Sequence, residues 1–344
     1  MSAQPPLAIL GTGIITAVGM TAAESCAAFR AKLANPSETR FAGSGGEWIT
    51  AHQVPLETPW RGVTRLAKLA ALAVDEALAD VPREEWSTLP MLLCVAEADR
   101  PGRLDGLDQE LAECIQAELG TNFGAPSVLV SHGRVSVAVA LAQARTLMKQ
   151  SAHRRALVVA VDSLLSWPTL SHYDEEDRLL SPTNSNGFLP GEAAGALLVG
   201  PPDRNRPQEL LCTGIGFAKE AAHIGSEEPL RADGLSQAIQ ASLADAGLSM
   251  GDMDFRIADC AGEHYYFKEA ALALSRTLRQ RKEEFDIWHP AECTGEVGAA
   301  AGTTVIAAAH AACLKGYANG PNILAHWSND SGQRAALTLQ HRGA

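Results

Sequence analysis

Two helices that are apolar on nearly every side limit what this chain can fold into. Residues 135–148 read VSVAVALAQARTLM, and residues 298–314 read GAAAGTTVIAAAHAACL. A helix without a continuous polar face has to be buried all round, unlike the amphipathic helices that cover a protein surface. A layer of helices between two sheets would bury them in this way. The chain is therefore predicted to be an α/β protein with helices in its centre.

Strands and helices alternate along the rest of the sequence. A run of three prolines within residues 201–207 reads as a linker, and the pattern of elements restarts after it. We therefore predict two similar halves, residues 1–205 and 206–344, which meet near Arg206. The predicted strands are 7–19 (partly loop), 90–96, 128–130, 155–161, 197–199, 210–218, 255–258, 324 and 336–339, and further helices are predicted at 64–78, 107–119, 234–247 and 267–278.

The charge balance excludes one broad class of partner. The chain has 28 Lys and Arg against 40 Asp and Glu, a net charge of −12. So acidic a protein is poorly suited to neutralising phosphate backbones, and we expect no binding to nucleic acid. No apolar run reaches the roughly 20 residues of a membrane span, and no signal peptide is evident, so we expect no membrane association and a cytoplasmic location.

The seven cysteines are scattered and include no CxxC pair. An odd number without paired spacing argues against a disulfide framework and against a structural zinc site. We expect reduced, mostly buried thiols, no metal and no cofactor.

Residues 187–199 read GFLPGEAAGALLV, in which glycine-rich turns lead into a buried strand. This segment resembles the glycine-rich signature of the β-ketoacyl synthases of the thiolase superfamily, and other segments resemble further motifs of that family in the same order. The resemblance implies a thiolase-like five-layered α-β-α-β-α fold built from two similar halves. The other matching segments are 11–19 (GTGIITAVG), 125–141 (APSVLVSHGRVSVAVAL), 253–263 (MDFRIADCAGE) and 294–302 (TGEVGAAAG).

The resemblance also implies where the chemistry would lie. Condensing enzymes of this family hold the acyl chain on a cysteine thiolate and use two histidines at the developing oxyanion. The nucleophile position here is Arg134, the first histidine position is Asp259, and the second is Glu296. A slip of one residue would place Cys260 or Ala261 at the first histidine position, and neither is a histidine.

One cation and two anions at positions that meet in relatives suggest an ion pair. We expect Arg134 to pair with Glu296, with Asp259 or with both, because an unpaired buried cation is costly. The set is either a new catalytic or anion-binding site, or an inactive pocket filled by salt bridges. The glycine-rich loop near the family's C-terminus corresponds to SNDSG at residues 328–332.

Other side chains are secondary candidates. Ser136 and His132 would suit a relocated nucleophile and base, although a helix serine commonly bonds to backbone. Cys260 would serve as a displaced thiol, although a buried, inert cysteine is the commoner state. His264 precedes an aromatic run that would line a cleft or an interface. The run DEEDR at residues 174–178 is typical of a solvated face, and the alternative is a partner-facing surface near the mouth of the pocket.

Two functions remain open at this point. The first is a non-catalytic ketosynthase-like protein in fatty acid or polyketide biosynthesis that acts as a partner or accessory subunit. The resemblance implies a homodimer, or a heterodimer with a ketosynthase-like chain, paired through residues 128–130, and a carrier protein or another client as a further partner. The alternative is an acyltransferase or thioester hydrolase with Glu296 as general base, acting on an acyl or pantetheine thioester.

Overall fold

The computed structural model describes residues 5–124, 128–150 and 153–343. The first three residues of the 125–141 motif lie outside this described part. Within it, the strands form a ten-stranded sheet of order β10-β9-β11-β12-β8-β1-β7-β6-β4-β5, and a separate two-stranded sheet of β2 (Ser37–Ala42) and β3 (Trp48–Ala51). The strands of the large sheet are β1 (Leu7–Ile15), β4 (Met91–Val95), β5 (Val128–Ser131), β6 (Ala156–Ser163), β7 (Glu192–Gly200), β8 (Glu209–Lys219), β9 (Phe255–Ala258), β10 (Ile287–Trp288), β11 (Asn322–Ser328) and β12 (Gln333–Arg342).

The large sheet contains the same arrangement twice. Each half contributes five strands, which can be numbered one to five in chain order. From the outer edge of the sheet to its middle, the order in both halves is third, second, fourth, fifth, first. The two halves join where β1 pairs antiparallel with β8, with Leu7 opposite Cys212. This repetition confirms the two similar halves. The connection between β7 and β8 contains the proposed boundary at 205/206, and separate domains at that point stay a prediction.

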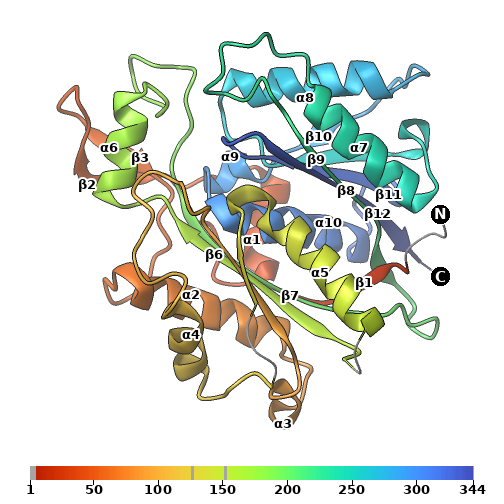
Figure 1. Cartoon of the computed structure of the whole chain (residues 1–344). Coiled ribbons are helices and arrows are strands. Elements are labelled where there is room, and N and C mark those ends of the chain that lie inside the picture. The colour runs from red at the N-terminus through yellow and green to blue at the C-terminus, as the bar shows by residue number, and fades with distance from the viewer. Residues whose placement is uncertain (1–4, 125–127, 151–152, 344) are drawn as a thin grey trace.

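Helices cover both faces of each half of the sheet (Figure 1). Helices α2 (Gly62–Ala77) and α4 (Leu111–Leu119) lie outside the N-terminal strands, and α7 (Asp233–Ala246) and α8 (His264–Thr277) lie outside the C-terminal strands. Between the two sets of strands lie α1 (Ala22–Ala31), α5 (Ser136–Gln150) and α10 (Ala301–Leu314). The five-layered α-β-α-β-α architecture is therefore confirmed.

Two of the central helices, α5 and α10, begin in the same way. A short 3-10 turn precedes each, η1 (Gly133–Val135) before α5 and η3 (Gly298–Ala300) before α10. The first residue of each turn is a glycine with φ of +53°, a conformation that other residues adopt at a cost. Both helices thus start at a sharp elbow, and α10 is buried along most of its length.

Some elements were not predicted. These are short, carry few apolar residues or, as in α1, have apolar residues without a clear amphipathic face, so their periodicity is weak. They are α1, β2, β3, β10, α3 (Arg83–Trp86), α6 (Trp167–Glu175) and α9 (Ala291–Thr294). The helix expected at 107–119 begins only at Leu111, after a turn that starts at Gly106.

Among the described residues, no helix is both long enough and apolar enough to cross a membrane.

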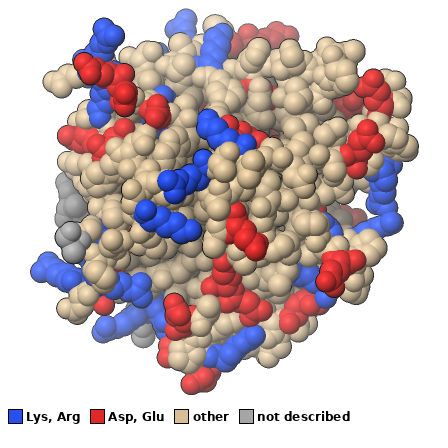
Figure 2. Space-filling view, turned by 180° about the vertical axis from the view of Figure 1, so that it is seen from behind, with Lys and Arg blue, Asp and Glu red and all other residues tan. Residues whose placement is uncertain are grey.

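On the face seen from behind, basic and acidic side chains are interspersed and uncharged residues cover most of the area (Figure 2).

Candidate functional site

The three positions matched to the family's Cys-His-His lie together. Arg134 follows the elbow before α5, Asp259 directly follows β9, and Glu296 lies between α9 and η3. Arg134 Nη1 lies 3.2 Å from Glu296 Oε2 and 4.0 Å from Asp259 Oδ2. All three side chains are buried. The fold therefore brings together residues that are up to 162 positions apart in the chain.

Backbone contacts fix the position of Glu296. Its N–H donates to the Leu189 carbonyl at 2.8 Å, and its own carbonyl accepts from the Gly191 N–H at 2.8 Å. The glycine-rich 187–199 segment is thus paired with the Glu296 segment. Gly295, with φ of +69°, allows this approach, because a Cβ there would lie 2.4 Å from the Leu189 oxygen. Glu296 Oε1 accepts the Gly298 N–H at 2.8 Å.

Asp330 is a member of this cluster that sequence reasoning missed. It lies in the loop between β11 and β12, and its Oδ1 accepts a hydrogen bond from Arg134 Nη2 at 2.5 Å. Tyr266 donates its hydroxyl to the same oxygen, accepts from Arg134 Nη2 at 2.6 Å, and places its ring 4.3 Å from the guanidinium carbon. The replacement of the family's glycine-rich loop by SNDSG was the signal that could have indicated Asp330.

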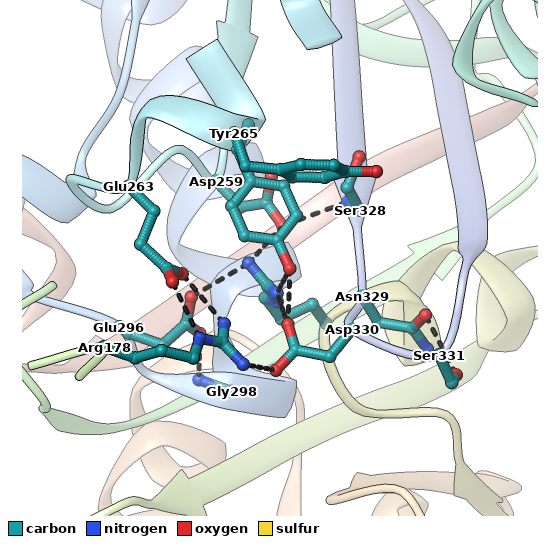
Figure 3. Close-up of polar contacts among 12 residues, drawn as sticks. Arg178, Asp259, Glu263, Tyr265, Glu296, Gly298, Ser328, Asn329, Asp330 and Ser331 are labelled. Carbon is teal, nitrogen blue, oxygen red and sulfur yellow. Dashed lines mark hydrogen bonds and ion pairs between the residues drawn. The ribbon is translucent and has the colours of Figure 1, made fainter. Parts of the chain in front are cut away.

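A second arginine, Arg178, joins the cluster through Asp330 and Glu263 (Figure 3). Arg178 Nη1 donates to Asp330 Oδ2 at 2.7 Å, and its Nε and Nη2 donate to the two oxygens of Glu263 at 2.8 and 2.9 Å. The expectation of a solvated charge run at 174–178 is therefore wrong for Arg178. Its side chain is only 17% exposed, because two carboxylates replace the water that the guanidinium would otherwise need.

The cluster contains two guanidinium groups and four carboxylates within the described residues, Asp259, Glu263, Glu296 and Asp330. Burial raises the pKa of Glu296 to about 7 and that of Asp259 to about 6, although Arg134 opposes both shifts. Arg134 and Arg178 outweigh burial at Asp330 and hold its pKa below the usual range. Asp330 is thus ionised at neutral pH, and Glu296 carries a proton for part of the time.

The side chains leave almost no free space at this position. The cavity next to Arg134 and Glu296 has a volume of about 20 Å³, and another beside Asp259 and Glu296 has about 10 Å³. A space of this size holds at most about one water molecule. A larger hollow of about 540 Å³ lies beside the cluster, and Arg100 lines both spaces. Arg100 Nη1 donates to Asp162 at 2.6 Å at this point.

The structure does not join the secondary candidates into a catalytic device. Ser136 Oγ donates to the backbone carbonyls of Val130 and Val95, at 3.0 and 3.3 Å. The His132 ring lies beside Gln333, with Nδ1 3.1 Å from Oε1, and only the His132 backbone N–H contacts Ser136 Oγ. A Ser136–His132 pair is therefore not formed.

Cys260 and His264 also lie apart from a reactive arrangement. Cys260 is buried, and burial raises the pKa of its thiol well above the usual range. His264 is exposed at the start of α8, where its backbone N–H donates to Asn186. Among the described residues, no group of three or more His, Cys, Asp or Glu is arranged to hold a metal ion.

No family model matches this chain. It is 31% identical over 149 residues to a protein of Streptomyces coelicolor (strain ATCC BAA-471 / A3(2) / M145) that is named provisionally as polyketide β-ketoacyl synthase 2. This match takes in 42% of the present chain and only 35% of that protein's length.

Solved structures match the fold over almost the whole chain. The ishigamide ketosynthase/chain length factor has a TM-score of 0.79 at 19% identity, with 99% of this chain and 100% of that chain covered. A type II polyketide synthase acyl-carrier protein in complex with its ketosynthase bound to the hexaketide has a TM-score of 0.80 at 15% identity, with 98% and 99% covered.

The fold is therefore the thiolase-like fold of ketosynthases and chain length factors. The sequence match and the order of motifs show that part of this chain is similar to a β-ketoacyl synthase, and the resemblance assigns Arg134, Asp259 and Glu296 to the positions of Cys, His and His.

Proposed function

We propose that this protein is a non-catalytic ketosynthase-like subunit that acts by binding another chain. The observation that carries the proposal is the filled pocket. Arg134, Tyr266 and Asp330 occupy the position where a ketosynthase would hold its acyl thioester, and about 20 Å³ of space remains. An arginine is no nucleophile at ordinary pH, because its guanidinium stays protonated.

Strand β5 is the proposed contact with the partner. It forms one edge of the large sheet, where β4 is its single strand partner within the described part of the chain, and its Leu129 is half-buried. An edge strand presents unpaired backbone groups that a second chain can pair with. The solved relatives include a ketosynthase/chain length factor and a ketosynthase in complex with an acyl-carrier protein. By analogy, we propose a ketosynthase-like chain as the first partner and a carrier protein as a second.

Covalent loading tests the catalytic half of this proposal. The purified chain is incubated with acyl- and malonyl-pantetheine thioesters, and its intact mass is measured. We expect no acyl adduct and no release of CO₂ above that of buffer. An adduct that survives denaturation would contradict the proposal.

The proposed binding to a partner chain is tested by the oligomeric state. It is measured by native mass spectrometry and analytical ultracentrifugation, with and without a ketosynthase chain. Leu129→Lys in β5 should abolish association. The matched control is Ile287→Lys in β10 at the opposite edge of the sheet, which should leave association intact. Association that is lost equally in both variants, or in neither, would contradict the role of β5.

A rearranged acyltransferase or thioester hydrolase is the second candidate. It is favoured by the pKa of Glu296, which burial raises to about 7 and which therefore suits a general base. The 540 Å³ hollow would bind the substrate. The Arg100–Asp162 ion pair, however, lies between this hollow and the small cavity beside Arg134. Hydrolysis of acyl-coenzyme A that Glu296→Gln abolishes would favour this candidate over the first.

A further inference from the structure

A second hollow lies on the C-terminal half, apart from the Arg134 cluster. It has a volume of about 370 Å³ and shares no lining residue with the cavities at that cluster. Ile257 of β9 and Ala308 of α10, both buried, form its floor. Exposed residues at the end of α1 form its rim, so it opens to solvent. A volume in this range is typical of small-molecule sites.

Aromatic rings make up much of the wall. Phe29, Trp288 and Tyr317 line the hollow. The Trp288 and Tyr317 rings are nearly parallel, with an interplanar angle of 21° and centroids 6.4 Å apart. The Trp288 ring is held by Phe255, whose centroid lies 4.4 Å away. Rigid aromatic faces of this kind favour a planar apolar ligand over a flexible one, because stacking needs little side-chain ordering.

The rim carries more positive than negative charge, on a chain whose net charge is −12. Arg30 and Lys32 are the cations and Glu292 is the one carboxylate among the lining residues. Lys32 Nζ lies 3.9 Å from Glu292 Oε2. Arg30 has no carboxylate within ion-pair distance among the described residues, and its guanidinium lies 4.6 Å from the Tyr317 ring centroid. One positive charge therefore remains available to a ligand.

A buried polar atom in the wall also lacks a partner. The Nδ1 atom of His289 is shielded from solvent and has no hydrogen bond within the described residues. The nearest carboxylate oxygen, on Glu292, is 3.9 Å away, which is too long for a hydrogen bond. A buried polar atom without a partner is costly. Because solvent does not reach Nδ1, a ligand oxygen would bond to it only if the His289 ring turned toward the hollow.

We propose that this hollow binds a planar aromatic carboxylate, with its rings against Trp288 and Tyr317 and its carboxylate toward Arg30. The 370 Å³ volume has room for a ligand of two fused rings. This site is independent of the function proposed for the Arg134 cluster, and either proposal can fail alone.

Titration of the purified chain with 2-naphthoate tests the proposal. Binding is measured by tryptophan fluorescence and by calorimetry. Saturable binding of one molecule per chain is expected. The neutral analogue 2-naphthalenemethanol should bind about fivefold more weakly, the size of effect expected for one partly exposed charge pair. Absence of saturation with 2-naphthoate, or equal affinity for the neutral analogue, would overturn the proposal. Tighter binding of octanoate would overturn the preference for an aromatic ligand.

Two variants locate the binding. Ala308→Leu fills the floor and should raise the Kd for 2-naphthoate at least about tenfold. Arg30→Glu reverses a charge on the exposed rim without touching the core, so it tests the site even if Ala308→Leu does not fold. It should raise the Kd by a similar factor. Arg231→Glu, an exposed arginine that does not line the hollow, is the matched control and should leave the Kd unchanged. An unchanged Kd in Arg30→Glu would place the binding elsewhere and overturn the proposal.

Discussion

Asp330 Oδ1 accepts a hydrogen bond from Arg134 Nη2 at 2.5 Å, although 196 residues separate them in the chain. The other oxygen of Asp330 accepts from Arg178 at 2.7 Å. A single carboxylate thus bridges a deeply buried guanidinium and one near the surface, and the stability of the whole cluster should depend on it.

Asp330→Asn should lower the free energy of unfolding by about 1–3 kcal/mol, because two guanidinium groups lose their shared counter-ion. The Asp330 side chain is 29% exposed, so solvent will offset part of the loss. Urea denaturation followed by circular dichroism measures the effect. Asp99→Asn, on an exposed side chain, is the control and should change the stability by less than about 0.5 kcal/mol.

Arg134→Met should destabilise the protein more at pH 7.5 than at pH 5. At pH 7.5 the variant leaves the Glu296 and Asp259 carboxylates without their cation, whereas at pH 5 both groups are largely protonated. Thermal melting of variant and wild type at the two pH values measures the difference. An equal loss at both would show that Arg134 does not compensate these carboxylates.

The free energy of unfolding should fall as the pH rises from about 4.5 to 7. The loss of the proton from Glu296 should account for about 1–3 kcal/mol of this fall. Its pKa is raised from 4.5 in the unfolded chain to about 7 in the folded one, so the folded state binds more protons across this window. Rising pH removes those protons and with them the stabilisation. Glu296→Gln should flatten this part of the curve when urea denaturation is measured at half-unit pH steps. A curve of the same slope in the variant would exclude Glu296 as its source.

About one thiol per native chain should react with Ellman's reagent, and seven should react in denaturant. Six of the seven cysteines are buried, and Cys114 alone is partly exposed. Burial raises the pKa of the Cys293 thiol to about 11, and that of Cys260 further, so neither is a thiolate at pH 8. Fast reaction of Cys260, identified by peptide mapping, would restore it as a candidate nucleophile.

Gly295→Ala should destabilise the protein by about 2 kcal/mol or more, because it combines a positive φ with a Cβ placed 2.4 Å from the Leu189 oxygen. Gly251→Ala is the matched control, since a Cβ there meets its nearest atom at 3.5 Å and its φ is not positive. Comparable losses in both variants would show that the close approach at Gly295 is not required.

The fold was predictable because its main signals are local. The apolar helices at 135–148 and 298–314, the alternation of strands and helices, and the glycine motifs can all be read within short windows. Elements with weak periodicity, such as α1 and the β2–β3 hairpin, were missed for the same reason. The placement of Arg134, Asp259 and Glu296 in one site followed from the family resemblance and not from any local pattern.

The sequence by itself determined that central helices would be buried between strands, and its resemblance to β-ketoacyl synthases predicted that a cation and two carboxylates stand at the Cys, His and His positions. Only the tertiary structure decided what surrounds Arg134. Its neighbours lie far apart in the chain: Asp330 is in a loop, Tyr266 is in a helix, and Arg178 is in a connection. Their interactions depend on distances of a few ångströms. Burial, which sets the pKa values and closes the pocket, is likewise a property of the packed chain and not of any segment of it.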